Sequence, residues 1–199
     1  MLNGLSINSF KSDSLGAFLK RGLEMRALSE CTLVPIAKLP ELIFVLYKIS
    51  PELIVRVIPL LVEQLQSENV AARSQVLELS GRLFSDPECR LYENEPNLWT
   101  EYLKRYCDIN PDIRCACIKQ AESILVVQPA LRGQVTDALI ARCKDSHQDV
   151  RLEVIRMVQR LARRKLEALS ERLLSQVIDR LRDKKVIFFF EIMVNIFKF

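Results

Sequence analysis

DINPDIR at residues 108–114 and DSHQDVR at residues 145–151 are two loops with the same design. In each, an aspartate precedes an arginine by six positions, and an aliphatic residue stands just before the arginine. The two aspartates are 37 residues apart, and Asp183 follows 38 residues later. Upstream, SENVAAR at residues 67–73 has the same length, with serine in place of the aspartate. Self-similarity at this period is typical of helical solenoids, in which a hairpin buries its apolar face only by stacking on its neighbours.

The segments between these loops have helical periodicity. Leu39, Leu42, Ile43 and Leu46 fall at positions i, i+3, i+4 and i+7, which predicts an apolar stripe on one side of a helix. Pro59 predicts that the next helix is kinked or split, because proline has no amide hydrogen to donate. Further helices are expected at about 70–84, 98–107, 111–127, 129–144, 150–164 and 169–181, with a polar connection over residues 85–96.

No strand pattern occurs before residue 186, so the predicted fold class is all-α, a right-handed α-solenoid of helical hairpins. These hairpins resemble the HEAT repeat, in which the loop aspartate and the arginine of the second helix tie adjacent repeats together. Carried over by position, this resemblance implies that Asp108, Arg114, Asp145 and Arg151 form a ladder between repeats and are not a ligand site.

The composition leaves little material for catalysis. The chain has five glycines in 199 residues and one histidine, His147, and it contains no GxGxxG or GxxxxGK[ST] loop for a nucleotide. Cys107, Cys115 and Cys117 lack a fourth ligand at the spacing of a zinc site. We therefore expect no catalytic residue, no metal, no cofactor and no small-molecule substrate, and we predict that the chain is not an enzyme.

The sequence also bears on the compartment. No apolar run reaches the ~18–20 residues that a membrane-spanning helix needs, and the first fifteen residues lack the apolar region of a signal peptide. The six cysteines form no CxxC pair and are interpreted as free thiols in a reducing compartment. The expectation is a soluble intracellular chain with no membrane contact.

A basic segment is the strongest candidate for a contact surface. Residues 150–185 contain eleven Lys/Arg and five Asp/Glu, a balance of +6, which leaves −2 for the rest of a chain whose net charge is +4. Arg156, Arg160 and Arg163 fall in one narrow stripe of a helix, opposite an apolar face. Such a stripe could contact DNA phosphates or an acidic peptide, or it could simply be a solvated face of the solenoid.

Aromatic residues gather in the third hairpin. Trp99, Tyr102 and Tyr106 share helical spacing, which favours packing in the core over an anchor for a bound peptide.

Three motifs resemble a known family. They are ELIFVLYKIS at residues 41–50, the helix pair that begins with VIPLL at residue 57, and the block LWTEYLKRYCDINPDIRCACIK at residues 98–119. In order and spacing they resemble the precocious-dissociation-of-sisters family of sister-chromatid cohesion regulators. The resemblance covers residues 32–185, and residues 1–31 are expected to be a separate tail with a weak helix.

The resemblance implies a non-enzymatic nuclear scaffold on chromatin. The family docks on the kleisin subunit of the cohesin complex, cooperates with the wings-apart-like release factor, and supports cohesin acetylation and the maintenance of cohesion. Its members are much longer than 199 residues, which implies that this chain is one segment of such a scaffold. The alternatives are a HEAT-repeat scaffold of another pathway, such as a transport receptor or phosphatase subunit, and direct DNA binding through the basic 150–185 face.

The last residues, VIFFFEIMVNIFKF at 186–199, break the pattern. They hold five of the nine phenylalanines, and the position where the repeat requires an arginine is Phe189. Valine codons begin with GT and phenylalanine codons are rich in T, as in translation that runs through a splice donor. We therefore expect residues 186–199 to be an apolar tail outside the solenoid, produced by an error in the gene model.

Overall fold

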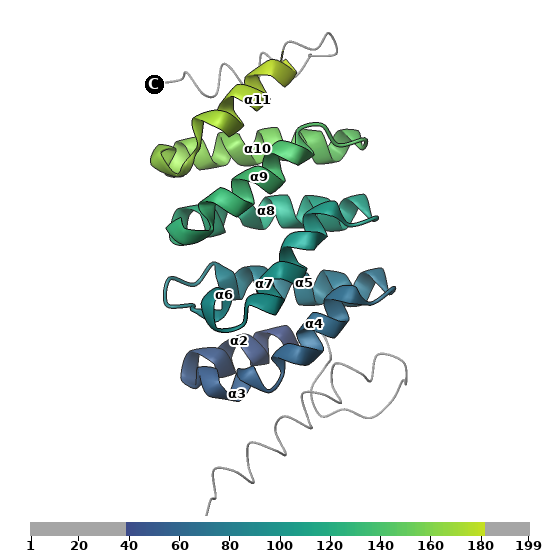
Figure 1. Ribbon diagram of the computed structural model, residues 1–199, viewed down its shortest axis with the longest axis vertical. Helices are drawn as coiled ribbons and strands as arrows, with labels where there is room; N and C mark the ends of the chain where they lie inside the picture. Colours follow the sequence, from purple (N-terminus) through teal and green to yellow (C-terminus); the bar gives the residue numbers. More distant parts are fainter. Residues whose placement is uncertain (1–38, 182–199) are drawn as a thin grey trace, which may run out of the picture.

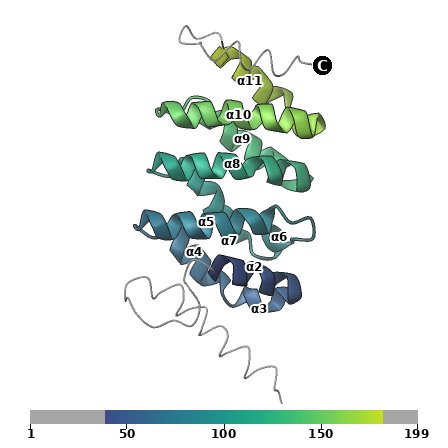
Figure 2. The same ribbon diagram turned by 180° about the vertical axis from the view of Figure 1, so that it is seen from behind.

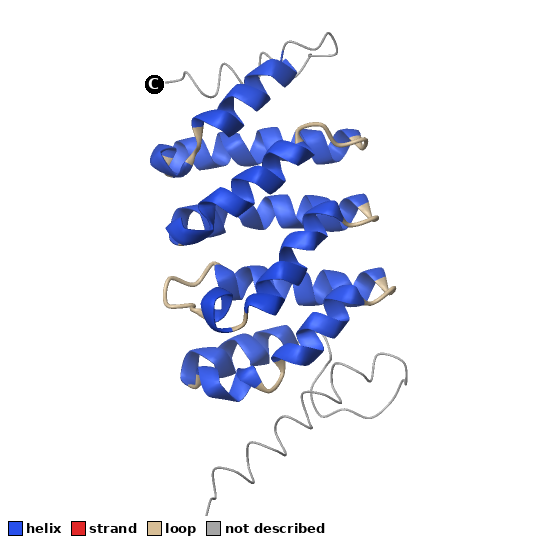
Figure 3. Ribbon diagram, viewed as in Figure 1, coloured by secondary structure: helices blue, strands red, loops and turns tan. Residues whose placement is uncertain are grey.

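The computed structural model describes residues 39–181, and this part of the chain is a stack of short helices joined by tight loops, without strands (Figures 1 and 3). The expected weak helix after residue 12 and the apolar tail at 186–199 lie outside the described residues. The helices are α2 (Leu39–Ile49), α3 (Pro51–Val55), α4 (Ile58–Gln66), α5 (Val70–Phe84), α6 (Leu91–Asn94), α7 (Pro96–Lys104), α8 (Pro111–Val127), α9 (Arg132–Arg142), α10 (Gln148–Arg164) and α11 (Glu171–Leu181), with 3₁₀ turns at Arg105–Cys107, Pro129–Leu131 and Leu166–Ala168.

The helices form two layers. In one layer α2, α5, α8 and α10 lie one above the next, and each contacts its neighbour in that order. In the other layer α4, α7, α9 and α11 cross them obliquely, as both views of the molecule show (Figures 1 and 2). One continuous apolar core fills the space between the layers. The predicted all-α solenoid of helical hairpins is confirmed.

Local sequence signals explain where the helices begin. The side-chain oxygen of Asn69 accepts hydrogen bonds from the amides of Ala71 and Ala72, and that of Asn110 accepts from Asp112 and Ile113. Asparagine in this position satisfies amides that have no partner inside the helix. The predicted split at Pro59 is also found. The α3 helix ends at Val55 and α4 begins at Ile58, which places the proline in the first turn, where its missing amide hydrogen costs nothing.

The polar connection expected over residues 85–96 is wrong for its second half. Leu91–Asn94 form the short helix α6, and α7 already begins at Pro96. The side chains of Cys89 and Leu91 are buried in the core, and this burial folds an otherwise polar stretch into a helical turn. The loop before it is also fixed, because the side-chain Nε2 of Gln128 donates to the Asp86 carbonyl over 2.7 Å and Lys48 Nζ lies 2.6 Å from the Asp86 carboxylate.

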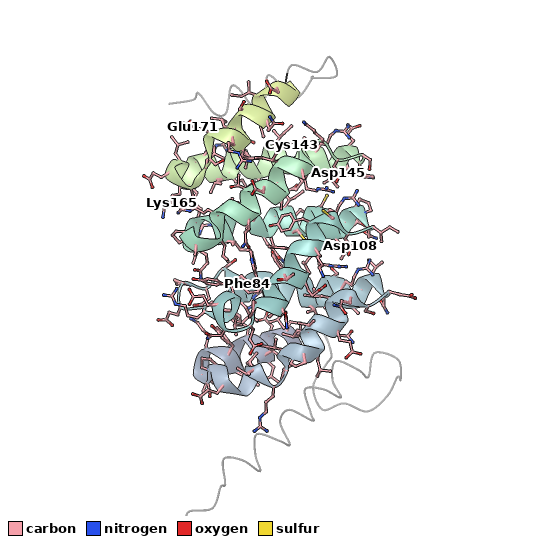
Figure 4. The ribbon with its side chains drawn as sticks, viewed as in Figure 1. Phe84, Asp108, Cys143, Asp145, Lys165 and Glu171 are labelled. Carbon is pink, nitrogen blue, oxygen red and sulfur yellow. The ribbon has the colours of Figure 1, made fainter. Side chains whose placement is uncertain are left out.

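The loops along one edge of the stack are joined by buried ion pairs. Arg73 of α5 donates from Nε and Nη2 to the two carboxylate oxygens of Asp108, each over 2.9 Å. Arg114 of α8 does the same to Asp145, over 2.9 and 2.8 Å. Figure 4 shows the two aspartates beside the loops at the same edge of successive hairpins. Each arginine therefore holds the loop of the following hairpin in a two-point grip.

The same arginines also close their own loops. Arg73 Nη1 donates to the carbonyls of Ser67 and Glu68, and Arg114 Nη1 donates to those of Asp108 and Ile109. Arg151 repeats the local half of this pattern, with Nη1 2.7 Å from the Asp145 carbonyl and 3.1 Å from that of Ser146. The aspartate next in register after Arg151, Asp183, lies outside the described residues.

These contacts predict unequal costs for two equivalent substitutions. Arg114→Ala removes a two-point partner from a buried carboxylate, and breaking a buried ion pair costs about 3–5 kcal/mol. For a chain of this size, that lowers Tm by about 6–20 °C. Arg151→Ala should lower Tm less, because among residues 39–181 it leaves no carboxylate without its arginine. Thermal unfolding followed by circular dichroism measures these changes, with the exposed Arg156→Ala as the control. Equal losses of Tm in Arg114→Ala and Arg151→Ala would contradict this assignment.

The ladder also predicts an acid-sensitive fold. Burial raises the pKa of Asp145, but the hydrogen bonds from Arg114 and from the His147 amide, together with the charges of Arg114 and Arg142, outweigh burial, so its pKa lies below the ordinary value. A folded-state pKa below the unfolded value gives stability that is present at neutral pH and is lost as pH falls from about 5 through the folded pKa. Asp145→Asn should therefore be less stable than the unaltered chain at pH 7, and the gap in unfolding free energy should narrow as pH falls toward 3. A gap that did not change with pH would contradict this account.

Candidate functional site

The basic stripe of α10 is only partly exposed. Arg156 and Arg163 face solvent, whereas Arg160 is half-buried against α8. Arg160 Nε lies 2.9 Å from a carboxylate oxygen of Glu122, and its Nη2 lies 3.0 Å from one of Glu153. Its charge is therefore used between two stacked hairpins. The contact stripe of Arg156, Arg160 and Arg163 stays a prediction, and the two ion pairs of Arg160 reduce the charge that it can offer to a partner.

Two other cations at the end of α10 also contact the neighbouring hairpin. Arg164 Nη1 lies 3.5 Å from Glu122, and Lys165 Nζ lies 3.4 Å from the Val126 carbonyl. A cation that does face solvent is Lys119 of α8, which precedes Arg156 by 37 residues, the same offset that separates Arg114 from Arg151. Lys119 and Arg156 thus place exposed positive charge at equivalent positions of two neighbouring hairpins, and Arg163 is exposed farther along α10.

The aromatic residues form part of the core, as their spacing predicted. Tyr102 and Tyr106 are fully buried, Trp99 is nearly so, and all three surround Phe84 or one another with ring centroids 4.8–6.2 Å apart. The Tyr102 hydroxyl donates to Gln120 of α8 over 2.8 Å. That glutamine lies so close to Gly81 of α5 that a β-carbon there would be 1.8 Å from its oxygen. A larger residue at position 81 would therefore force the end of the Gln120 side chain to move away from its present place beside Tyr102.

Buried carboxylates, the usual material of acid–base chemistry, are all paired in the described part of the chain. The five acidic residues that are buried between residues 39 and 181 each form an ion pair with a lysine or arginine. Their partners are Lys48 for Asp86, Lys104 for Glu101, Arg73 for Asp108, Arg114 for Asp145 and Arg160 for Glu153. Such pairing fixes a carboxylate in place, which suits a structural role.

The histidine and the cysteines that could bind a metal or take part in catalysis are not grouped in one place in the described part of the chain. His147 is exposed in the loop before α10, with Nδ1 3.7 Å from the Asp149 carboxylate. Cys107 is exposed, Cys115 is partly buried and Cys117 is buried. Between residues 39 and 181 no three histidine, cysteine or acidic side chains are grouped as metal ligands would be. Over the same residues, no helix combines the length and the apolar character that crossing a bilayer requires.

Two sets of arginines were missed by the sequence analysis. Arg73 was not identified as a ladder residue because its own loop begins with Ser67, although its partner is the aspartate of the following loop. Arg105 and Arg142 each precede a ladder aspartate by three residues and reach it over 2.9 and 2.8 Å. The repeated spacing R-x-x-D, present in RYCD at 105–108 and RCKD at 142–145, was the available signal.

Comparison with known proteins places this geometry in a family. Residues 5–187 match the model of the family described as sister chromatid cohesion protein PDS5. The match begins well before residue 32, so the expectation that residues 1–31 stand apart from the family is wrong for most of that segment.

Individual proteins that are similar in sequence to this chain belong to the same family. The chain is 33% identical over 145 residues to sister chromatid cohesion protein PDS5 homolog B-A of Xenopus laevis, and 32% identical over 145 residues to the human PDS5 homolog B. PDS5 homolog A of Danio rerio is 31% identical over 145 residues. These alignments cover 73% of this chain but only 10–11% of each relative, so the chain spans about a tenth of the length of the proteins it matches.

A solved structure shares the fold. A chain in the Pds5–Scc1 complex, described for its implications for cohesin function, superposes with a TM-score of 0.77 at 20% sequence identity. The superposition covers 87% of this chain and 27% of that one. The helical hairpins, their ladder and the family match over residues 5–187 agree, and the chain belongs to the PDS5 family of sister chromatid cohesion proteins.

Proposed function

We propose that this chain is a segment of a non-enzymatic scaffold that associates with the cohesin complex through its kleisin subunit and regulates sister-chromatid cohesion in the nucleus. The observation that carries the proposal is the family match over residues 5–187, which spans the whole described solenoid. In this role it acts with the wings-apart-like release factor that the family resemblance implies. The family match favours cohesion over the transport-receptor and phosphatase alternatives.

The physical properties of the solenoid support a scaffold. A partner-binding surface is most effective when it is ordered before the partner arrives, because less conformational freedom is then lost on binding. Here the buried carboxylates are paired, and Arg73 and Arg114 fix successive loops to one another. The result is a pre-ordered array of helices in two layers (Figures 1 and 2).

Binding to the kleisin is the direct test. The purified chain, immobilised by a tag, should retain the purified kleisin subunit of the same organism, and Arg114→Ala should weaken retention because it disturbs the stacking of the hairpins. Arg156→Ala, which changes an exposed charge without a ladder contact, is the matched control and should retain kleisin normally. Failure of the unaltered, folded chain to retain kleisin would contradict the proposal for this segment.

A second candidate, direct contact with DNA through the basic 150–185 face, is favoured by one observation. Lys119 and Arg156 are exposed at equivalent positions of adjacent stacked helices, with the exposed Arg163 farther along α10. The use of Arg160 and Arg164 in ion pairs between hairpins reduces the charge that this face can offer to phosphates.

Salt dependence distinguishes phosphate contact from other binding. If Lys119 and Arg156 contact phosphates of a fluorescent duplex, the slope of log K against log salt should fall by about 0.9 for each residue replaced by glutamine. Arg172→Gln, which removes a cation already paired with Asp137 at 3.1 Å, should leave the slope unchanged. Absence of binding at low salt, or equal effects of all three substitutions, would exclude a specific DNA contact by this face.

A further inference from the structure

One layer of the solenoid carries three exposed charges at matching positions. Glu78 of α5, Lys119 of α8 and Arg156 of α10 are all exposed, and each stands eight positions after the first residue of its helix. Each also follows, by five positions, the arginine that closes the loop before its helix, so the three positions are structurally equivalent. We call Glu78, Lys119 and Arg156 the charge row.

The charge row crosses the stack on the side that faces away from the core. Val76, Cys117 and Val154, two positions earlier in each helix, are buried, and two positions along a helix correspond to a rotation of about 200°. The helices α5, α8 and α10 lie one above the next in both views (Figures 1 and 2), and each contacts its neighbour. Packed helices are about 8–10 Å apart, so the three charges follow one another at about that interval.

The charges of the row are not used inside the described part of the chain. Within residues 39–181, none of the three forms an ion pair. One turn further along the helices the situation differs, because Arg82 is paired with Glu41 and Arg160 with Glu122. One turn earlier, the equivalent positions hold uncharged residues, which are Ser74, Cys115 and Leu152. The row therefore presents the sequence of charges negative, positive, positive to a partner.

We propose that the charge row is a docking surface for an extended segment of a partner protein, in which a basic residue is followed by two acidic residues at intervals of three, as in Lys-x-x-Glu-x-x-Glu. A polyproline II segment has three residues per turn and rises about 3.1 Å per residue. Every third side chain then lies on the same side, about 9 Å from the last, which matches the spacing of the helices. In a β-strand, side chains on one side recur about every 6.6 Å, which does not match.

Glu78 favours a peptide over DNA as the occupant. A DNA backbone presents only negative charge, so a strand that contacts Lys119 and Arg156 along the row would be repelled at Glu78. A peptide can supply both signs. Exposed ion pairs each add little affinity, so we expect the row to set the register of the partner, with affinity coming from contacts beside it. This surface is distinct from the kleisin contact, which is expected not to need Arg156.

Titration of the isotope-labelled chain with short peptides, followed by NMR at low salt, measures such weak binding. The first peptide is Lys-Pro-Pro-Glu-Pro-Pro-Glu, whose prolines preform the polyproline II helix, and the second is Glu-Pro-Pro-Glu-Pro-Pro-Glu. The unaltered chain should bind the first about threefold or more tightly, because one ion pair with Glu78 replaces one repulsion. The amide shifts should be largest on α5, α8 and α10. In Glu78→Lys, the preference should reverse.

Two further variants test whether position or net charge decides the preference. Glu63→Lys makes the same change of charge at an exposed residue of α4, in the other layer, and should leave the preference for the first peptide in place. Arg156→Glu should make the chain prefer Lys-Pro-Pro-Glu-Pro-Pro-Lys over the first peptide. All three substitutions replace exposed side chains, and circular dichroism checks that each variant keeps its helical fold.

The outcomes are distinct. Reversal by Glu78→Lys but not by Glu63→Lys would support the charge row as the docking surface. Equal affinities for the two peptides, or no binding of the first peptide at low salt, would overturn the proposal. Reversal by Glu63→Lys as well would also overturn it, because net charge alone would then explain the preference. Displacement of the first peptide by an equal concentration of a short DNA duplex would make nucleic acid the occupant instead. These measurements do not involve kleisin, so they leave the proposed function untouched.

Discussion

The two-point grip of an arginine on the aspartate of the following loop is the interaction on which the remainder of the fold depends. Removing ions from water is costly, and a buried pair gives back that cost only when its geometry is good and its remaining hydrogen bonds are satisfied. Asp108 meets both conditions, because it accepts from Arg73, from Arg105 and from the backbone amide of Asn110. A hairpin displaced by one helical turn would leave the same groups buried without partners. The ladder therefore selects one register of stacking among several that would bury similar apolar area.

Much of this architecture could be predicted from the sequence because its signals are local. The caps at Asn69 and Asn110 and the break at Pro59 act within a few residues, so their effects follow from the residue types. The repeat period made the loops at residues 108–114 and 145–151 recognisable as equivalent. The short helix α6 was not predictable in this way, since it depends on where Leu91 finds a place in a core built by distant elements.

The same distinction applies to the candidate contact residues. Helical periodicity correctly separated the polar side of α10 from Val154, Met157 and Leu161, which are buried. It could not show that Glu122, 38 residues earlier, lies opposite Arg160 and neutralises it. Arg73 was not predicted as a ladder residue because its own loop begins with a serine. An aspartate in these loops has a local role, which is to accept the amide of the residue two positions on, and a long-range role as the partner of an arginine. Ser67 performs only the local role, through its hydroxyl, so its loop lacks the aspartate by which the other two were recognised.

The unequal fastening of the two edges gives the solenoid a preferred direction of bending. Along the edge of the Arg–Asp ladder, the pairs Arg73–Asp108 and Arg114–Asp145 are short, charged, two-point hydrogen bonds that are nearly closed to water. Along the other edge, the contacts are of mixed kinds: Lys48, whose side chain is partly open to solvent, pairs with Asp86, while Lys165 and Gln128 donate to the carbonyls of Val126 and Asp86. The ladder edge should therefore be the stiffer of the two edges. We expect a mechanical load on such an array to separate the helices at the second edge first, so that the curvature changes while the spacing of the ladder loops stays constant.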